Sequence, residues 1–250
     1  MAVSAIDLNA DLAEECGDDA SLYPQLSSAN ICCGAHAGGP VAMRQAVQAA
    51  VEHGVSIGAH VGYADRENFG RDDVEMSYTD LYELTRNQIE ALLEITREFN
   101  VALRYVKPHG ALYHRIGSDS QQAQAVVDAI ADIDATWHVL VPNTPVIAAA
   151  ADSRGLLIAH EFFADRAYLP AGTLAPRSMP GSVLHDSDVI SKRVMQWLET
   201  GQLVATDGSV INVVAESICL HGDTLGAVDN AQTIHRDLLS AGYVIKSWLD

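Results

Sequence analysis

The sequence predicts an α/β fold in which strands alternate with helices and close into an irregular βα barrel. Short apolar segments alternate with segments of helical spacing along all 250 residues, which is the pattern of a parallel sheet covered by helices. Polar residues stand at the C-terminal ends of these apolar segments, where βα barrels build their sites. We count seven such segments, so we expect a seven-stranded, TIM-like barrel that forms one domain over residues 1–250.

Four strands are predicted in the first half of the chain. They span residues 6–12, 27–34, 55–60 and 101–106. The first alternates strictly and places Asp7, Asn9 and Asp11 on one face, opposite an apolar face. Histidines follow the second strand and end the third, at His36 and His60. Because parallel strands bring their C-terminal ends to one edge, we expect Asp11 and these histidines to lie close together.

The fourth strand runs into the stretch Lys107-Pro108-His109-Gly110. Proline has no N–H for the sheet ladder, and glycine lets the backbone turn sharply. We therefore expect a strand that ends in a tight loop, with Lys107 and His109 facing the same way because they are two residues apart. Lysine is seldom fully buried without a partner. Lys107 is thus a candidate for specific work in a chain that has only three lysines.

The second half of the chain supplies three more strands. They are predicted at residues 137–141, 156–163 and 217–223. The last of them ends with His221 and Asp223, which share one face. Residues 203–214 read as a hairpin around Asp207-Gly208. Residues 169–185 have no hydrophobic period, so we predict a long loop, and loops of that length are usually functional.

Helices are predicted between these strands. Their ranges are 41–53, 77–99, 118–130, 145–153, 189–199 and 227–241. Pro40 and Gly54 suit the first and the terminating positions of the first helix. The helix over 77–99 has a continuous apolar stripe, which is typical of a helix packed on a sheet. Ser118 and Gln121 have the spacing of a capping box.

The net charge of the chain limits the kinds of molecule that it is expected to bind. The formal net charge is −18, and no cluster of lysine and arginine is present. Such a chain is a poor ligand for nucleic acid or an anionic membrane. The N-terminus has neither the basic start nor the apolar core of a secretory signal, and no apolar run approaches the ~20 residues of a membrane helix. We expect a cytoplasmic protein.

The cysteines do not form a recognisable metal or redox motif. The four cysteines are Cys16, Cys32, Cys33 and Cys219, and none belongs to a C-x-x-C pair. The adjacent Cys32 and Cys33 lack the spacing with which two thiolates ligate one zinc ion. We therefore interpret all four as reduced thiols, most of them buried.

The strand ends form a candidate active site. A single histidine at a strand end is usually a hydrogen-bonded structural residue, but here His36, His60, His109 and His221 all occupy such positions together with Asp11 and Asp223. Imidazole and carboxylate groups at one mouth could perform acid–base chemistry. Asp11 plus two histidines could alternatively hold a divalent metal, although the H-E-x-x-H spacing is missing.

The sequence has neither a P-loop nor a G-x-G-x-x-G stretch after a strand. The phosphates of a nucleotide would therefore have to be bound by cationic side chains from separate parts of the chain. The candidates are Lys107, Arg71, Arg166 and Arg177. Each arginine also has an ordinary alternative role as the partner of a nearby acid.

Several motifs, in order along nearly the whole chain, carry a family resemblance. They are Asp7-Leu8-Asn9-Ala10-Asp11-Leu12, Ser28-Ala29-Asn30-Ile31, Cys33-Gly34, His36-Ala37-Gly38, Gly58-Ala59-His60, Phe69-Gly70-Arg71, Val106 to Tyr113, Glu161, Phe163-Ala164-Asp165-Arg166, Tyr168 and His221-Gly222-Asp223. The sequence resembles the LamB/YcsF family. The resemblance implies a βα barrel of the glycoside hydrolase/deacetylase type. It also implies the ATP-dependent opening of 5-oxoproline to L-glutamate, together with 5-oxoprolinase subunits B and C.

The resemblance and the strand ends together yield a set of candidate residues. We expect catalytic roles for Asp11, His36, His60, Lys107 and His109. We expect substrate binding by Asn9, Arg71, Glu161, Arg166, Arg177, His221 and Asp223. In one hypothesis, Lys107 and either Arg71 or Arg166 stabilise a phosphorylated lactam oxygen. In that hypothesis Asp11, helped by His36 or His60, activates water, and His109 or His221 protonates the leaving nitrogen.

Two other functions stay open at this point. A metal-dependent amide or carbohydrate deacetylase would use the same mouth, and a non-catalytic subunit would only present substrate to its partners. The sequence also departs from the family pattern at Ala13, Gly39, Val61, Asn87 and Glu90. At Gly39 the family has an aspartate, which would be either a helix N-cap or a catalytic carboxylate, and we favour the cap.

Overall fold

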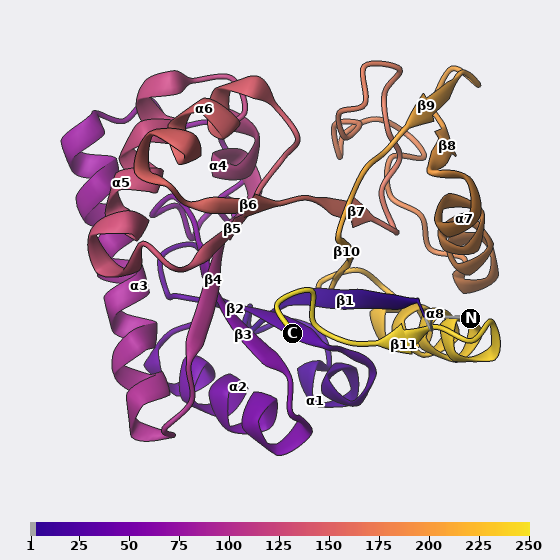
Figure 1. Ribbon diagram of the computed structural model, residues 1–250, viewed down its shortest axis with the longest axis horizontal. Coiled ribbons are helices and arrows are strands. Elements are labelled where there is room, and N and C mark those ends of the chain that lie inside the picture. The colour runs from indigo at the N-terminus through magenta and orange to yellow at the C-terminus, as the bar shows by residue number, and fades with distance from the viewer. Residues whose placement is uncertain (1–3) are drawn as a thin grey trace.

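The computed structural model describes residues 4–250. Its strands form a largely parallel sheet in the order β6-β5-β4-β3-β2-β1-β10-β7 (Figure 1). Residues 1–3, part of the N-terminal stretch in which we predicted no secretory signal, lie outside the described residues. The strands of this path are β1 (Ala5–Leu12), β2 (Ser28–Cys32), β3 (Ser56–Val61), β4 (Leu103–Pro108), β5 (His138–Leu140), β6 (Leu157–Ala159), β7 (Glu161–Phe163) and β10 (Ser217–His221). A short strand, β11 (Val244–Ile245), pairs with the start of β1.

Helices cover the outside of this sheet. They are α1 (Asp19–Leu22), α2 (Pro40–His53), α3 (Tyr78–Glu98), α4 (Gly110–Arg115), α5 (Ser120–Asp134), α6 (Pro145–Arg154), α7 (Ser187–Thr200) and α8 (Ala227–Ser240), with a 3-10 turn at Tyr23–Gln25. Figure 1 shows α3 and α5 along one side of the molecule and α7 with α8 on the opposite side. The apolar stripe predicted for the helix over 77–99 is buried in α3, where Leu81, Ile89 and Leu92 are inaccessible.

The fold class is confirmed, but the strand count is eight in the sheet path rather than seven. The predicted strand over 156–163 is divided at His160 into β6 and β7, which cross the middle of Figure 1 as one extended segment. Its first half pairs with β5, and its second half pairs with β10. At the break, the His160 N–H donates to the carboxylate of Glu216 instead of to a neighbouring strand, 2.7 Å away. One segment thus joins the two ends of the sheet.

Local predictions were mostly right. The hairpin forms from β8 (Gln202–Val204) and β9 (Val210–Asn212), and residues 169–185 lack helix or ladder strands. Two details were wrong. The backbone turns sharply at Gly110, which has a φ of 52°, as expected, but helix α4 begins there where only a tight loop was predicted. Helix α5 is capped by Asp119, which accepts from Gln121 N–H and Gln122 N–H, and not by a Ser118 capping box.

Strand β1 is buried on both faces from Ile6 onward, and one of these faces is polar. Asp7, Asn9 and Asp11 are each at most 4% exposed, and the alternating apolar residues of β1 pack in the main hydrophobic core. Polar side chains from neighbouring strands meet those of β1: Asn30 on β2 donates to Asn9, and Asn9 donates to Ser217 on β10. The interior is therefore a hydrogen-bonded polar column that leads to the strand ends. None of the helices formed by residues 4–250 combines the length and apolarity that crossing a membrane requires.

Candidate active site

The C-terminal strand ends surround a cavity of about 390 Å³. Eight of the twelve predicted site residues line it, namely Asp11, His60, Arg71, Lys107, His109, Arg166, Arg177 and His221. The other four do not line the cavity: His36, Glu161 and Asp223 contact lining residues, and Asn9 bonds Asn30, which bonds Asp11. The structure thus brings most of the predicted set to one mouth.

Lys107 occupies the centre of the strand ends and is 1% exposed. Its Nζ lies 2.8 Å from Asp11 Oδ1, 2.9 Å from Glu161 Oε2 and 3.2 Å from Cys219 Sγ. Burial alone would lower the pKa of the Lys107 ammonium, but Asp11 and the neighbouring Glu161 raise it well above its usual range. Lys107 is therefore charged and already holds two carboxylates.

Asp11 ends β1 and uses its two carboxylate oxygens differently. Oδ1 accepts from Lys107 and, at 2.8 Å, from the side-chain amide of Asn30. Oδ2 faces His60 Nε2 at 3.4 Å. Burial alone would raise the pKa of Asp11, but His60 and Lys107 hold it well below its usual range. Asp11 is therefore an ionised, firmly held carboxylate with one oxygen turned toward the histidines.

His60 and His109 form an imidazole pair at the wall of the cavity. His60 Nδ1 lies 3.0 Å from the carbonyl oxygen of Lys107, and His109 Nε2 lies 2.8 Å from that of Phe69. Their other nitrogens, His60 Nε2 and His109 Nδ1, face each other at 2.9 Å. Burial, followed by the neighbouring histidines, lowers the pKa of His109 well below its usual range, so this ring is neutral at pH 7.

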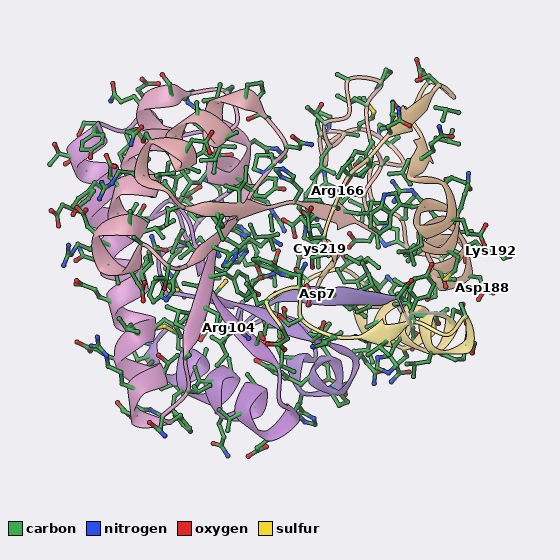
Figure 2. All side chains as sticks on the ribbon, in the orientation of Figure 1. Asp7, Arg104, Arg166, Asp188, Lys192 and Cys219 are labelled. Carbon is green, nitrogen blue, oxygen red and sulfur yellow. The ribbon has the colours of Figure 1, made fainter. Side chains whose placement is uncertain are left out.

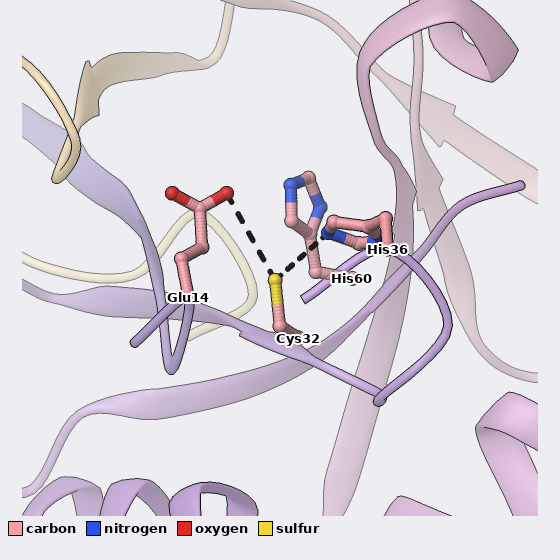
Figure 3. Close-up of side chains that lie close together, drawn as sticks. All are labelled: Glu14, Cys32, His36 and His60. Carbon is pink, nitrogen blue, oxygen red and sulfur yellow. Dashed lines mark hydrogen bonds between the residues drawn. The ribbon is translucent and has the colours of Figure 1, made fainter. Parts of the chain in front are cut away.

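His36 stands behind this pair, outside the cavity. Its ring stacks on that of His109 with centroids 3.8 Å apart, and its Nε2 lies 2.9 Å from Cys32 Sγ (Figure 3). Burial, followed by the charge of His60, lowers the pKa of His36 from 6.5 to about 3. The buried Glu14, also drawn in Figure 3, has its pKa raised well above its usual range by burial and then by Asp11.

His221 belongs to a second, separate dyad on the far side of Lys107. Its Nδ1 lies 2.8 Å from Asp165 Oδ1, and Asp165 also accepts from the hydroxyl of Thr224 at 3.1 Å. Burial alone would raise the pKa of Asp165, but His221 lowers it. The ionised Asp165 therefore fixes the orientation of the His221 ring, which lines the cavity.

Three arginines supply positive charge at the cavity. Arg71 forms an ion pair with Asp223, and Arg177 Nη2 lies 3.8 Å from the same carboxylate. Arg166 comes from the long segment between β7 and α7, where Figure 2 labels it, and is 4% exposed. It donates to the carbonyl oxygens of Ser182 at 3.3 Å and Ala175 at 2.6 Å. Burial, followed by Arg177, lowers the pKa of Arg166 to about 10, so its charge persists at pH 7. Among residues 4–250, no carboxylate forms an ion pair with Arg166.

Sequence reasoning missed several members of the site. Glu14 received no role, although it follows Asp11 by three residues at a strand end, which is the one available signal. Asp165 was noted only within a motif, because nothing local indicates that it meets His221, 56 residues away. Asn9 lies one layer below the cavity, where it bonds Ser217 and Asn30.

Two overlapping groups of side chains could hold a metal ion. One consists of Glu14, Cys32, His36 and His60, and the other of Asp11, Glu14, His60 and His109. In each group the ligand atoms lie within 4.8 Å of one another, and all the residues are buried. The three thiols that are not in these groups are unpaired as expected, and Cys33 and Cys219 are buried.

Comparison with known proteins places this site in a family. The LamB/YcsF family model matches residues 6–250. The chain belongs to this family. A LamB/YcsF relative from Agrobacterium fabrum, the first of its 5-oxoprolinase A subunits, is 45% identical over 252 residues, which cover 98% of each chain. The crystal structure of the lactam utilization protein from Thermus thermophilus superposes with a TM-score of 0.90 at 36% identity, covering 97% of this chain and 99% of that one.

The LamB/YcsF barrel also resembles more distant folds. A T48 deacetylase superposes with a TM-score of 0.50 at 12% identity, covering 97% of this chain and 87% of the deacetylase. At that identity the likeness concerns the fold alone. It agrees with the expectation of a barrel of the deacetylase type.

Proposed function

We propose that this protein is the A subunit of a 5-oxoprolinase and opens the lactam ring of 5-oxoproline to give L-glutamate. The observation that carries the proposal is the 45% identity, over 98% of both chains, to a protein named as a 5-oxoprolinase A subunit. We further propose that it acts in the cytoplasm, as a single domain, with subunits B and C and with ATP as co-substrate.

The cavity suits a small anionic amide. 5-Oxoproline carries one carboxylate and one lactam, and a volume of about 390 Å³ is enough to enclose it. Arg166 is the strongest candidate for the carboxylate, because it is buried, lines the cavity and has no acidic partner among residues 4–250. Arginine binds carboxylates in a fixed fork geometry that also sets orientation.

The acid and base roles follow from the contacts of each group. Asp11 has a depressed pKa and is therefore a weak proton acceptor, which makes it an electrostatic anchor. The inner nitrogens of His60 and His109 are better placed to accept a proton from water. His221 suits the protonation of the leaving nitrogen, since Asp165 holds one ring nitrogen while the ring lines the cavity.

ATP would solve the problem that a lactam is a poor electrophile. In our proposal the γ-phosphoryl group passes to the lactam oxygen and ADP leaves, and a first water then adds to the ring carbon. The carbon–nitrogen bond breaks with protonation of nitrogen to give an acyl phosphate, which a second water hydrolyses to L-glutamate and phosphate. Arg71 would stabilise the phosphorylated oxygen, because Arg166 is assigned to the substrate carboxylate. Lys107 is already enclosed by two carboxylates, so we assign it the task of holding Asp11. With no P-loop in the chain, we assign ATP binding to the partner subunits.

Reconstitution tests the proposal. The purified chain, alone and mixed with subunits B and C, is given 5-oxoproline with and without ATP, and glutamate and ADP are measured. We expect equal amounts of glutamate and ADP only in the complete mixture. An Arg166→Gln chain should raise KM at least about tenfold, the value of one charge-assisted contact. Absence of glutamate in every mixture, or deacetylation of an N-acetyl sugar by the chain alone, would refute the assignment.

A further inference from the structure

The hydrogen bonds of His60 and His109 fix where their protons are. His60 Nδ1 and His109 Nε2 each face a backbone carbonyl oxygen, at 3.0 and 2.8 Å. A carbonyl oxygen only accepts, so both of these nitrogens must carry hydrogen. A neutral imidazole has one N–H. When both rings are neutral, the two inner nitrogens, His60 Nε2 and His109 Nδ1, are lone pairs that face each other at 2.9 Å.

Two carboxylate oxygens point at the same place. Asp11 Oδ2 lies 3.4 Å from His60 Nε2, and Glu14 Oε1 lies 3.7 Å from His109 Nδ1. Within residues 4–250, apart from the rings themselves, the only donor near these four atoms is the weak thiol of Cys32, 3.9 Å from Glu14 Oε1. When Glu14 is ionised and both rings are neutral, four acceptors thus converge at a point where a hydrogen-bond donor is missing.

Charge leads to the same conclusion. Asp11, Glu14 and Glu161 are buried carboxylates, and Lys107 is the one buried ammonium among them. If all are ionised, two negative charges stay uncompensated in a region with little water, which is strongly unfavourable. In the metal-free chain, a proton on Glu14, whose pKa is raised, and a proton shared by the two imidazoles would compensate these charges. A divalent cation would compensate both and would occupy the space between the four acceptors.

We propose that Asp11, Glu14, His60 and His109 bind one first-row divalent transition-metal ion. The donor set of two imidazoles and two carboxylates suits Zn²⁺ or a neighbouring ion better than Mg²⁺. The proposal deepens the proposed function, because Asp11, His60 and His109 line the substrate cavity. A metal bound there would use the lone pairs of His60 and His109 as ligands and would replace them in activating water, because it would lower the pKa of a bound water.

The surroundings hold these ligands as the second layer of a metal site does. Asn30 and Lys107 occupy Asp11 Oδ1, which leaves Oδ2 free. The carbonyl that orients His109 belongs to Phe69, whose φ of 58° lies in the left-handed region that a non-glycine residue rarely adopts. Such strain is typical of functional sites, and here it directs a carbonyl at a ligand.

The overlapping group with Cys32 and His36 is the weaker candidate. The Cys32 thiol can donate to His36 Nε2 at 2.9 Å, so this contact is satisfied without an ion (Figure 3). In Figure 3 the sulfur lies between Glu14 and the His36 ring, with a dashed contact to each. This difference provides a matched control.

The test is metal binding by the full chain, measured without any activity assay. The purified protein is stripped with a chelator, its fold is checked by circular dichroism, and it is titrated with Zn²⁺ alone and with Co²⁺ alone. We expect one ion per chain and a Co²⁺ spectrum without the intense band of a cobalt–thiolate bond. Glu14→Gln and His109→Gln should each weaken binding at least about tenfold, whereas Cys32→Ser should leave the affinity within about threefold.

Two results would overturn the proposal. One is a folded wild-type chain that binds neither ion stoichiometrically, in which case the two imidazoles share a proton. The other is binding that survives His109→Gln but is lost in Cys32→Ser. Neither result depends on glutamate formation, so failure of the metal site and failure of the 5-oxoprolinase assignment are separate outcomes.

Discussion

Two buried carboxylate regions on the same stretch of chain differ in how their hydrogen bonds are completed. At the start of β1, Asp7 accepts hydroxyl groups from Ser27 and Ser28, both at 2.6 Å, and from Ser217. Just past its end, Glu14 meets imidazole nitrogens and thiols, and no strong donor among residues 4–250 reaches its carboxylate. Figure 2 labels Asp7 on β1, in the middle of the molecule.

This difference distinguishes buried polar side chains that stabilise the fold from buried polar side chains that are available to bind a ligand. The Asp7 region is satisfied by the chain itself, so its carboxylate needs no ligand. The region of Asp11, Glu14, His60 and His109 has an excess of acceptors and opens on a cavity. A buried polar cluster that lacks donors is incomplete without something bound to it. Both regions lie on one polar face, so burial alone does not tell them apart.

The largest effect should come from Asp11→Asn. This change removes the charge opposite Lys107 and alters the face turned to His60, so we expect glutamate formation by the reconstituted complex to fall at least about 100-fold. The control is Asp7→Asn, the same substitution on the same strand, which should leave the rate of the folded protein within about twofold. Equal losses in both variants would mean that the two regions are not functionally distinct.

The pH dependence of stability should single out Asp7. Burial raises the pKa of Asp7 from 3.8 to about 6, so between these values the folded protein binds the proton more tightly than the unfolded chain. The stabilisation is complete below pH 3.8 and is lost as the pH rises through about 6. Relative to Asp7→Asn, the wild type should therefore lose about 2 kcal/mol of unfolding free energy between pH 4 and pH 7. Urea unfolding at several pH values measures this, and parallel curves for the two proteins would contradict it.

A smaller effect is expected from Tyr105→Phe, which acts between the two regions. The Tyr105 hydroxyl donates to Asn30 Oδ1 at 2.6 Å, and the Asn30 amide in turn bonds Asp11. Losing this buried donor should lower the unfolding free energy by about 1–2 kcal/mol. Tyr78→Phe, which removes an exposed tyrosine–Asp128 contact, should cost less than about 0.5 kcal/mol. Chemical denaturation measures the unfolding free energy of both variants. Equal losses would mean that the hydrogen bond from Tyr105 to Asn30 adds nothing to the stability of the polar column.

The smallest effect should come from Gly39→Asp. Gly39 is the N-cap of α2, has an extended φ of 170°, and leaves open space where a Cβ would stand. The new carboxylate should accept N–H groups of the first turn and stabilise the protein by a few tenths of a kcal/mol. Thermal unfolding measures this gain, and the rate of glutamate formation should not change. A tenfold gain in rate would instead mean that this carboxylate belongs to the catalytic region.

The parts of the fold that depend on local pattern could be predicted from the sequence. The alternation of Asp7, Asn9 and Asp11 is set by the two-residue period of a strand, and Pro40 with Gly54 bounds α2 as expected. The division at His160 could not be predicted, because it depends on which strands lie beside each half of the segment and on Glu216, 56 residues later. The capping of α5 by Asp119 instead of Ser118 could not be predicted either, because adjacent aspartate and serine residues are similarly good N-caps.

The sequence by itself determined the βα barrel, the strand ends at which polar residues gather and the family to which the chain belongs. It did so because hydrophobic period and motif order are properties of neighbouring residues. Only the tertiary structure decided that Lys107 is held by Asp11 and Glu161, that Asp165 orients His221, and that Glu14 joins the histidines. These contacts join distant segments, and the protonation of each imidazole depends on whether its neighbour can donate a hydrogen bond.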